Sequence, residues 1–229
     1  MSFLMRARYD GKAISGIINQ IVCSLILVRC TRKVLIVVAV LDLMKDVFFL
    51  VGALEDAHLA ERKHCGDYTI EIDQKNEAWL RVVALKFFSV FHKKPTIRLR
   101  SGNRYYRLRL HSKKILLETK QLRSYVYDHL LNADREAQSC FLRGIYDAEG
   151  SVHKKRQSIV VSNKKARIIR LCQLLLEEVG ITTGRVYIDR VTGVRSLPMY
   201  GKNNLRLFNK YIGFSHPNKK ERLRFLIDP

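Results

Sequence analysis

The chain has 229 residues, enough for one large domain or for two small domains that share a core. Its composition, 47% hydrophobic and 28% charged, is typical of a globular protein and excludes a fibrous or disordered chain. The 42 lysine and arginine residues against 21 acidic residues give a formal net charge of +21, which opposes compaction unless an anionic partner neutralises it. We therefore expect a nucleic acid as partner, although charge alone identifies no activity.

The first 45 residues are apolar and basic, and the sequence assigns them no chemical role. The apolar run from Ile14 to Met44 is interrupted by charged residues, so no stretch approaches the roughly 18 uncharged residues of a membrane span, and we expect no membrane role. The pattern is compatible with a helix packed on the rest of the chain or with a small DNA-contacting extension. Five cysteines form no CxxC pair, which argues against a zinc or disulfide framework; they are Cys23, Cys30, Cys65, Cys140 and Cys172.

The remaining residues repeat one pattern twice. We predict a first half at 46–118, a connector at 119–135 that is helical in part, and a second half at 136–229. Each half opens with an apolar helix that carries a glycine in its middle and ends in acidic residues. The two openings read FFLVGALEDAHL from Phe48 and CFLRGIYDAEGSV from Cys140.

The same elements follow each opening in chain order. In the first half, the period-two alternation of YTIEID predicts a strand, and a 3.6-residue apolar period predicts an amphipathic helix. The elements of the first half are a strand from about Leu59, a strand at Tyr68–Asp73, a helix at Glu77–Phe91, a hairpin at Thr96–His111 and a short helix from about Lys113. Those of the second half are strands around His153–Gln157 and at Ser158–Ser162, a helix at Ala166–Val179, a hairpin at Gly184–Tyr200, a helix at Asn203–Ile212 and a closing helix at Pro217–Leu226.

The order of elements predicts an α+β fold of two pseudo-symmetric αββαββα repeats. Each repeat would form a twisted antiparallel sheet, with one face on helices and the other exposed as half of a saddle. Such a saddle fits the groove of double-stranded DNA.

The string FLRGIYDAEGSV at 141–152 resembles the LAGLIDADG signature of homing endonucleases, with Gly144 at the glycine and Glu149 at the last acid. The repeat from Phe48 to about Phe214 resembles the monomeric, two-motif members of that family, especially those encoded within archaeal introns. The resemblance implies that the two signature helices pack side by side and place one acid each beside the DNA. It also implies a monomer that cuts both strands of a long DNA target, leaves 3′ overhangs and promotes intron mobility. We expect such a protein in the cytoplasm, at the nucleoid if its source is prokaryotic.

The first motif departs from the signature. Counting five residues from Gly52 reaches Ala57, which has no metal-binding group, whereas the same count from Gly144 reaches Glu149. Counting back three residues from the strand that follows gives Asp56 in the first copy and Glu149 in the second. We prefer this second registration and assign Asp56, with Glu55 as the alternative and a degenerate half-site as a further one.

Two acids at the DNA suit the chemistry of phosphodiester hydrolysis. Carboxylates can hold a divalent ion that activates water and neutralises the charge of the transition state. Mg²⁺, or another divalent cation such as Mn²⁺, is the expected cofactor, with Asp56 and Glu149 as its ligands. Further polar residues at the end of the second strand occupy equivalent places where the family positions water and phosphate; they are Gln74, Lys75, Asn163 and Lys164. The alternative is that Asn76 and Asn163 are helix caps and that the lysines are solvated.

Basic residues are spaced along the predicted hairpins as on a ribbon and not clustered as in a tail. Arginine can bind guanine edges or phosphates, and the sequence does not say which. The candidates for DNA contact in the first half are Arg98, Arg100, Arg104, Arg107 and Arg109. In the second half they are Lys154, Lys155, Arg156, Gln157, Arg185, Tyr187, Arg190 and Arg195.

Two other functions share this pattern. A splicing maturase or another nucleic-acid-binding protein without nuclease activity is favoured by the irregular first motif. A transcription regulator of the same fold would carry an added recognition domain, and no convincing helix-turn-helix pattern occurs in residues 1–45.

Overall fold

A computed structural model describes residues 33–100, 102 and 104–228, with the side chains of residues 33–40 excepted. Most of the N-terminal extension predicted at 1–45, together with Cys23 and Cys30, therefore lies outside the described residues. Residues 33–45 belong to a long helix, α2 (Lys33–Ala53), so the predicted boundary at residue 46 falls inside a helix.

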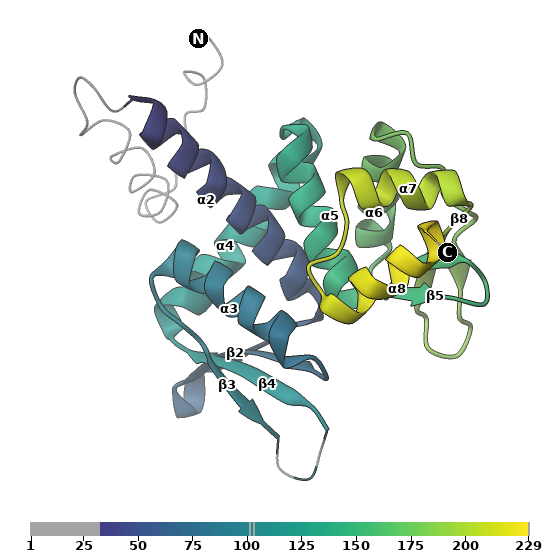
Figure 1. Cartoon of the computed structure of the whole chain (residues 1–229). Helices are drawn as coiled ribbons and strands as arrows, with labels where there is room; N and C mark the ends of the chain where they lie inside the picture. The colour runs from purple at the N-terminus through teal and green to yellow at the C-terminus, as the bar shows by residue number, and fades with distance from the viewer. Residues whose placement is uncertain (1–32, 101, 103, 229) are drawn as a thin grey trace.

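The two halves share one αββαββα order of main elements, and the second half ends in an additional helix (Figure 1). After α2, the first half consists of η1 (Leu54–Asp56), β1 (His58–Arg62), η2 (Lys63–Cys65), β2 (Asp67–Gln74), α3 (Glu77–Phe91), β3 (Thr96–Leu99), β4 (Tyr106–His111) and α4 (Lys113–His129). After η3 (Leu130–Asn132), the second half consists of α5 (Arg135–Glu149), β5 (Gly150–His153), β6 (Ser158–Asn163), α6 (Ala166–Glu178), β7 (Tyr187–Ile188), β8 (Arg195–Tyr200), α7 (Lys202–Tyr211) and α8 (Pro217–Ile227). The predicted α+β architecture of two αββαββα repeats is confirmed.

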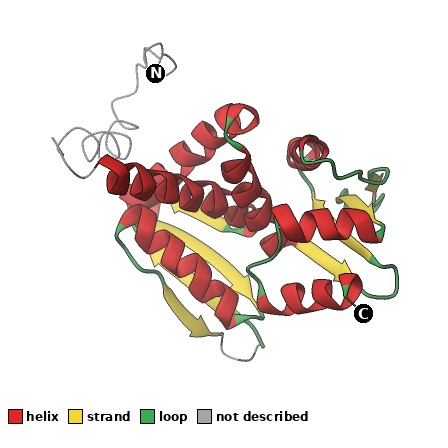
Figure 2. Cartoon of the chain, turned by 45° about the horizontal axis from the view of Figure 1, so that its top comes forward, coloured by secondary structure: helices red, strands yellow, loops and turns green. Residues whose placement is uncertain are grey.

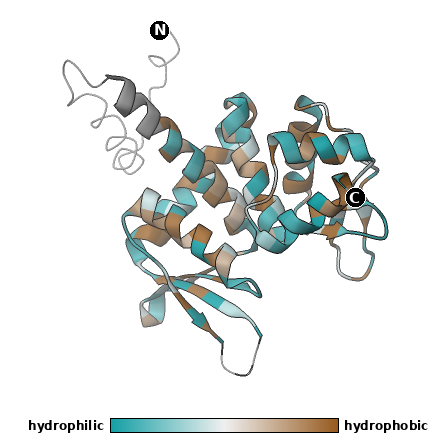
Figure 3. Ribbon diagram, viewed as in Figure 1, coloured by the Kyte–Doolittle hydropathy of each residue, from teal (hydrophilic) through white to brown (hydrophobic). Residues whose placement is uncertain are grey.

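Each half forms a four-stranded antiparallel sheet, in the orders β1-β2-β4-β3 and β5-β6-β8-β7. Helices lie over one face of each sheet, as Figure 2 shows. In the first sheet the covered face carries Ile70, Ile72, Leu108 and Leu110, each at most 2% exposed. Hydrophobic and hydrophilic residues alternate along these strands (Figure 3), because successive side chains of a strand point to opposite faces.

The helices α2 and α5 pack against each other at the centre of the molecule (Figure 1). A Cβ added to Gly52 would lie 2.3 Å from the carbonyl oxygen of Phe141, and one added to Gly144 would lie 2.1 Å from that of Phe49. No larger residue fits at either position without moving a backbone. The two glycines therefore set how closely the two halves approach.

Capping residues define the ends of several helices. The Asn76 side chain accepts a hydrogen bond from the backbone N–H of Trp79 at the start of α3, and Ser112 and Asp134 cap α4 and α5 in the same way.

The helix α4 has 17 residues and is longer than the short helix expected there, so the predicted boundary between residues 118 and 119 also falls inside a helix. Within the described part of the chain, no helix is both long and apolar enough to cross a membrane.

Candidate active site

The two signature motifs differ in length by one residue. Gly52 and Gly144 are equivalent, because each packs on the backbone three residues before the other glycine. Leu59 and Val152 are also equivalent, because they pair with corresponding positions of β2 and β6. The first motif thus spans one residue fewer between its glycine and its strand than the second.

A change of helix type compensates for the missing residue. The first helix tightens from α to 3₁₀ geometry over Leu54–Asp56, whereas α5 remains α-helical through Glu149. Three 3₁₀ residues advance about 6 Å along the axis, which is also the advance of about four α-helical residues. Asp56 therefore reaches the level of Glu149, and Ala57 already has extended backbone geometry. The role of Asp56 as a metal ligand stays a prediction, and this geometry supports it.

Asp56 and Glu149 lie within each other's electrostatic influence. Partial burial raises the pKa of Glu149 to about 7, and the negative charges of Asp56 and Glu55 act in the same direction. The pKa of Asp56 is also raised, chiefly by loss of hydration; Lys219 opposes this shift and Asp73 adds to it. Both pKa values are raised chiefly by loss of hydration, and neighbouring negative charge adds to the shift.

The acids that precede these two in the motifs are buried and engaged in structure. Glu55 accepts hydrogen bonds from Arg123, Tyr127 and Lys165, and its side chain is fully buried. Asp147 is also fully buried and accepts the backbone N–H groups of residues 215 and 216, just before α8 begins. Glu55 therefore has little capacity left to bind a metal ion, which favours Asp56 of the two candidates.

Asn163 lies directly beside one of the acids. Its amide nitrogen donates to Oε1 of Glu149 at 2.9 Å, and its side-chain oxygen accepts the backbone N–H of Lys165. The N-cap of α6 is Lys165, so Asn163 is not the helix cap of the alternative interpretation, whereas Asn76 is. Asn163 therefore fixes the carboxylate of Glu149.

The other three predicted polar residues are arranged less closely. Gln74 occupies the register position of Asn163, and its side-chain oxygen accepts the N–H of Lys75 at 3.3 Å. The ammonium of Lys75 lies 5.2 Å from the ring centroid of Tyr105. Lys164 is exposed to solvent. Both lysines remain open to a phosphate, and their role stays a prediction.

Lys219 of α8 belongs to this site, although no sequence pattern pointed to it. Its ammonium donates to the carbonyl oxygens of Tyr146 and Asp147, at 3.1 and 2.6 Å, at the end of α5. Burial lowers the pKa of Lys219 to about 8, while Asp147, Asp56 and Glu149 act against that shift. A lysine 70 positions after Glu149 carries no sequence signal, because only the packing of α8 brings it to the acids.

The donor set fits a hard divalent cation. The two candidate ligands are carboxylates, and a cation between them would offset the loss of hydration and the repulsion that together raise the pKa of Glu149. Among the described residues, no group of three or more His, Cys, Asp or Glu side chains is placed to hold a metal ion. The remaining ligands would have to be water and phosphate oxygens, which Mg²⁺ accepts readily.

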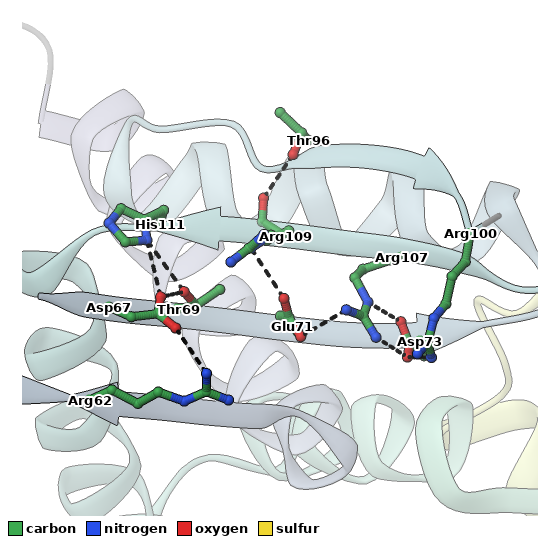
Figure 4. Close-up of polar contacts among 10 residues, drawn as sticks. All are labelled: Arg62, Asp67, Thr69, Glu71, Asp73, Thr96, Arg100, Arg107, Arg109 and His111. Atoms are coloured by element: carbon green, nitrogen blue, oxygen red, sulfur yellow. Dashed lines mark hydrogen bonds and ion pairs between the residues drawn. The ribbon is translucent and has the colours of Figure 1, made fainter. Parts of the chain in front are cut away.

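The exposed face of the first sheet carries the predicted arginines, but three acids lie among them (Figure 4). Arg107 forms a two-pronged pair with Asp73, with both N···O distances at 2.7 Å, and Arg100 reaches the same carboxylate at 3.2 Å. Glu71 lies 3.2 Å from Arg107 and 3.1 Å from Arg109. The third acid, Asp67, pairs with Arg62 and His111 at one end of β2; Arg98 and Arg104 are exposed.

The predicted basic residues of the second half lie mostly in turns. Lys154, Lys155, Arg156 and Gln157 form the exposed turn between β5 and β6, and Arg185, Tyr187 and Arg190 are exposed around β7. Arg195 differs from these, because its guanidinium donates to the carbonyl oxygen of Lys164 at 2.6 Å. Arg195 thus stabilises the turn that follows Asn163. A contact of Arg195 with DNA would compete with its hydrogen bond to Lys164.

The fold and the site together indicate a protein of the LAGLIDADG class. It has two helices packed through small residues, each helix ends in acids, and each is followed by a four-stranded sheet. Residues 136–213 match the model of the LAGLIDADG-like domain. The second half therefore carries a LAGLIDADG-like domain, and the chain as a whole resembles the two-motif members of that family.

Individual relatives agree with this class. The chain is 27% identical over 201 residues to the homing endonuclease I-ApeI of Aeropyrum pernix, a match that covers 79% of this chain and 86% of that protein. It is 39% identical over 94 residues to a probable translation initiation factor of Thermococcus kodakarensis, and 24% identical over 200 residues to a glutamine–fructose-6-phosphate aminotransferase of Methanocaldococcus jannaschii. The chain spans only 8% and 17% of the lengths of these last two proteins.

Solved structures show the same fold. The crystal structure of I-DmoI in complex with DNA and Mn superposes with a TM-score of 0.60 at 20% identity, covering 74% of this chain and 97% of that chain. The complex of I-DmoI with DNA and Ca gives a TM-score of 0.62 at 18% identity, covering 80% of this chain and 98% of that chain.

Proposed function

We propose that this chain is a site-specific endonuclease that cuts both strands of double-stranded DNA in a reaction that requires a divalent cation. The observation that carries the proposal is the convergence of Asp56 and Glu149 at the ends of two helices packed through Gly52 and Gly144. The family and the fold support DNA cutting, since one relative is named a homing endonuclease and the matched structures hold DNA with Mn or Ca.

Each residue of the candidate site would have a separate role. Asp56 and Glu149 would hold the cation, Mg²⁺ or Mn²⁺, which when bound supplies charge neutralisation and an activated water. Asn163 orients the carboxylate of Glu149, and Lys75 and Lys164 offer positive charge to the phosphate. The arginine-bearing face of the first sheet and the basic turn at 154–157 would bind the duplex.

The resemblance to homing endonucleases supports a proposal on the wider biological role. We propose that the enzyme acts as a monomer on an asymmetric target, because the two halves of the chain differ in sequence at their DNA faces. Cleavage with 3′ overhangs would serve intron mobility, and the enzyme would act in the cytoplasm on genomic DNA.

The test is cleavage of a randomised duplex library in Mg²⁺ by the parent, Asp56→Asn and Glu149→Gln. We expect the parent to cut a defined site and both variants to bind it with cleavage reduced at least a hundredfold. Glu77→Gln removes one negative charge from the start of helix α3, outside the candidate site, and should cut like the parent. Binding by the parent without cutting, with or without binding of RNA, would instead favour the maturase function.

A second variant pair tests the registration of the first motif. If Asp56 is the ligand, Ala57→Asp will not restore cutting to Asp56→Ala, because residue 57 already lies in extended backbone beyond the helix end. Restored cutting would assign the role to position 57.

A further inference from the structure

The first sheet places carboxylates among the arginines on its exposed face. Asp67, Glu71 and Asp73 are alternate residues of β2, so they point away from the core face that carries Ile70 and Ile72. Acids on a surface that binds a polyanion oppose binding. Their presence at the centre of this face therefore requires a physical explanation.

The geometry of Arg107 supplies one. Its Nε and Nη2 donate to the two carboxylate oxygens of Asp73, and its Nη1 lies 3.2 Å from Glu71 (Figure 4). Two acids thus hold one guanidinium in a fixed orientation, while 30% of its side chain stays exposed. A guanidinium has five N–H groups, so some of them remain available to another acceptor.

The neighbouring arginines share the same two acids. Arg100 reaches Asp73 from the β3–β4 turn, and Arg109 reaches Glu71 from the adjacent position of β4. The pKa of Asp73 is lowered, chiefly by its hydrogen bond from Arg107, so this carboxylate is charged at neutral pH.

The second sheet has no such network at the equivalent positions. Ser162 and Val160 occupy the register positions of Asp73 and Glu71, and Ser162 faces Ser196 where Asp73 faces Arg107. The hydroxyl groups of Ser162 and Ser196 lie 2.8 Å apart. The paired acids are therefore a property of the first half and not a requirement of the fold.

We propose that Asp73 and Glu71 are specificity-determining positioning residues, which hold Arg107, Arg100 and Arg109 for contact with base edges and restrain them from binding phosphates. This inference rests on the proposed function and adds how the first half discriminates between DNA sequences. An arginine already paired with a carboxylate gains little by exchanging it for a phosphate. It can still donate its remaining N–H groups to a neutral acceptor such as guanine O6 or N7 without leaving the acid. The first half would thus read its half of the target more strictly than the second.

The test measures binding in EDTA, so that it does not depend on cutting. The parent, Asp73→Asn and Glu71→Gln each select from a randomised duplex library, and each is then titrated with its selected duplex and with an unrelated duplex at several salt concentrations. We expect both variants to lose sequence preference in one half of the selected motif. Their ratio of specific to non-specific affinity should fall about tenfold. For the unrelated duplex, the slope of log K against log salt should steepen by about 1, because a released arginine contacts a phosphate.

Glu77→Gln is the matched control, since it also removes one acid paired with an arginine, Arg81, but on helix α3. We expect its motif, affinity ratio and salt slope to equal those of the parent. The inference is overturned if both acid variants select the parental motif with equal preference, or if Glu77→Gln produces the same loss. A parent that selects a motif but does not cut would contradict only the nuclease function, whereas a parent that selects no motif would overturn both.

Discussion

At the scale of single residues, the acids of the two motifs have different roles because their surroundings differ. Glu55 is buried among Arg123, Tyr127 and Lys165, which compensate its charge. Glu149 is partly buried beside other acids, and only Asn163 donates a side-chain hydrogen bond to it among the described residues. A buried carboxylate with several donors is a structural element, and one beside another carboxylate is suited to bind a cation.

Glu149 gives a prediction on pH and stability. Its pKa in the folded protein is about 7, above the ordinary value of 4.5, so between these values the folded state keeps a proton that the unfolded state has released. Stability of the metal-free protein should therefore fall as the pH rises through this window and change little above it. We expect Glu149→Gln to be more stable than the parent by about 1–2 kcal/mol at pH 8 and nearly equal at pH 4.5. Urea unfolding in EDTA at a series of pH values measures this, and a difference that does not vary with pH would contradict it.

At the scale of elements, the pair of signature helices holds the two halves together and positions the acids. The α-to-3₁₀ change at Leu54–Asp56 makes up for a one-residue deletion, and the contact through Gly52 and Gly144 keeps both helix ends at the same level. The helix α8 adds Lys219 to the end of α5, where a positive charge is favourable at a helix C-terminus. Three helices and the ends of β2 and β6 therefore build the candidate active site.

The close helix contact predicts a large effect of a single methyl group. Gly144→Ala would bring a Cβ to 2.1 Å from the backbone carbonyl oxygen of Phe49, so the helices must separate. We expect a loss of about 3 kcal/mol in the free energy of unfolding, and a similar loss for Gly52→Ala. Ala78→Ser, which adds one atom at an exposed position of α3, should cost less than about 0.5 kcal/mol. Thermal or urea unfolding compares the three variants, and equal stability of Gly144→Ala and the parent would show that the contact is not tight.

At the scale of the whole molecule, the charge of the chain and its two sheets suit a polyanionic partner such as double-stranded DNA. The formal net charge is +21, and basic residues occupy the exposed face of the first sheet and the turns of the second half. The acids of β2 reduce this charge locally, so the first half has a mixed surface and the β5–β6 turn a purely basic one.

This distribution predicts a strong dependence of DNA binding on salt. Neutralising six or more phosphates would give a slope of log K against log salt of about −5 or steeper for the parent. Changing Lys154, Lys155 and Arg156 together to Gln should flatten the slope by about 2 to 3, since three phosphate contacts are lost. Fluorescence anisotropy with a labelled duplex measures both. A slope near zero for the parent would exclude a phosphate-based interface.

The sequence by itself determined the repeat, the order of elements and the two motif helices. The apolar periods of 3.6 and 2 residues are local properties, so α3 was predicted at Glu77–Phe91 with the bounds that the structure has, and both sheets follow from their hairpins. The local pattern of the sequence does not show which side chains distant along the chain come into contact. The tertiary structure alone decided that Glu55 is engaged by three partners, that Lys219 joins the acids and that Asp73 and Glu71 hold the arginines of β4. The reason is physical: local pattern specifies which face of an element is buried, whereas the partner of a polar side chain depends on residues that only packing brings within about 3 Å.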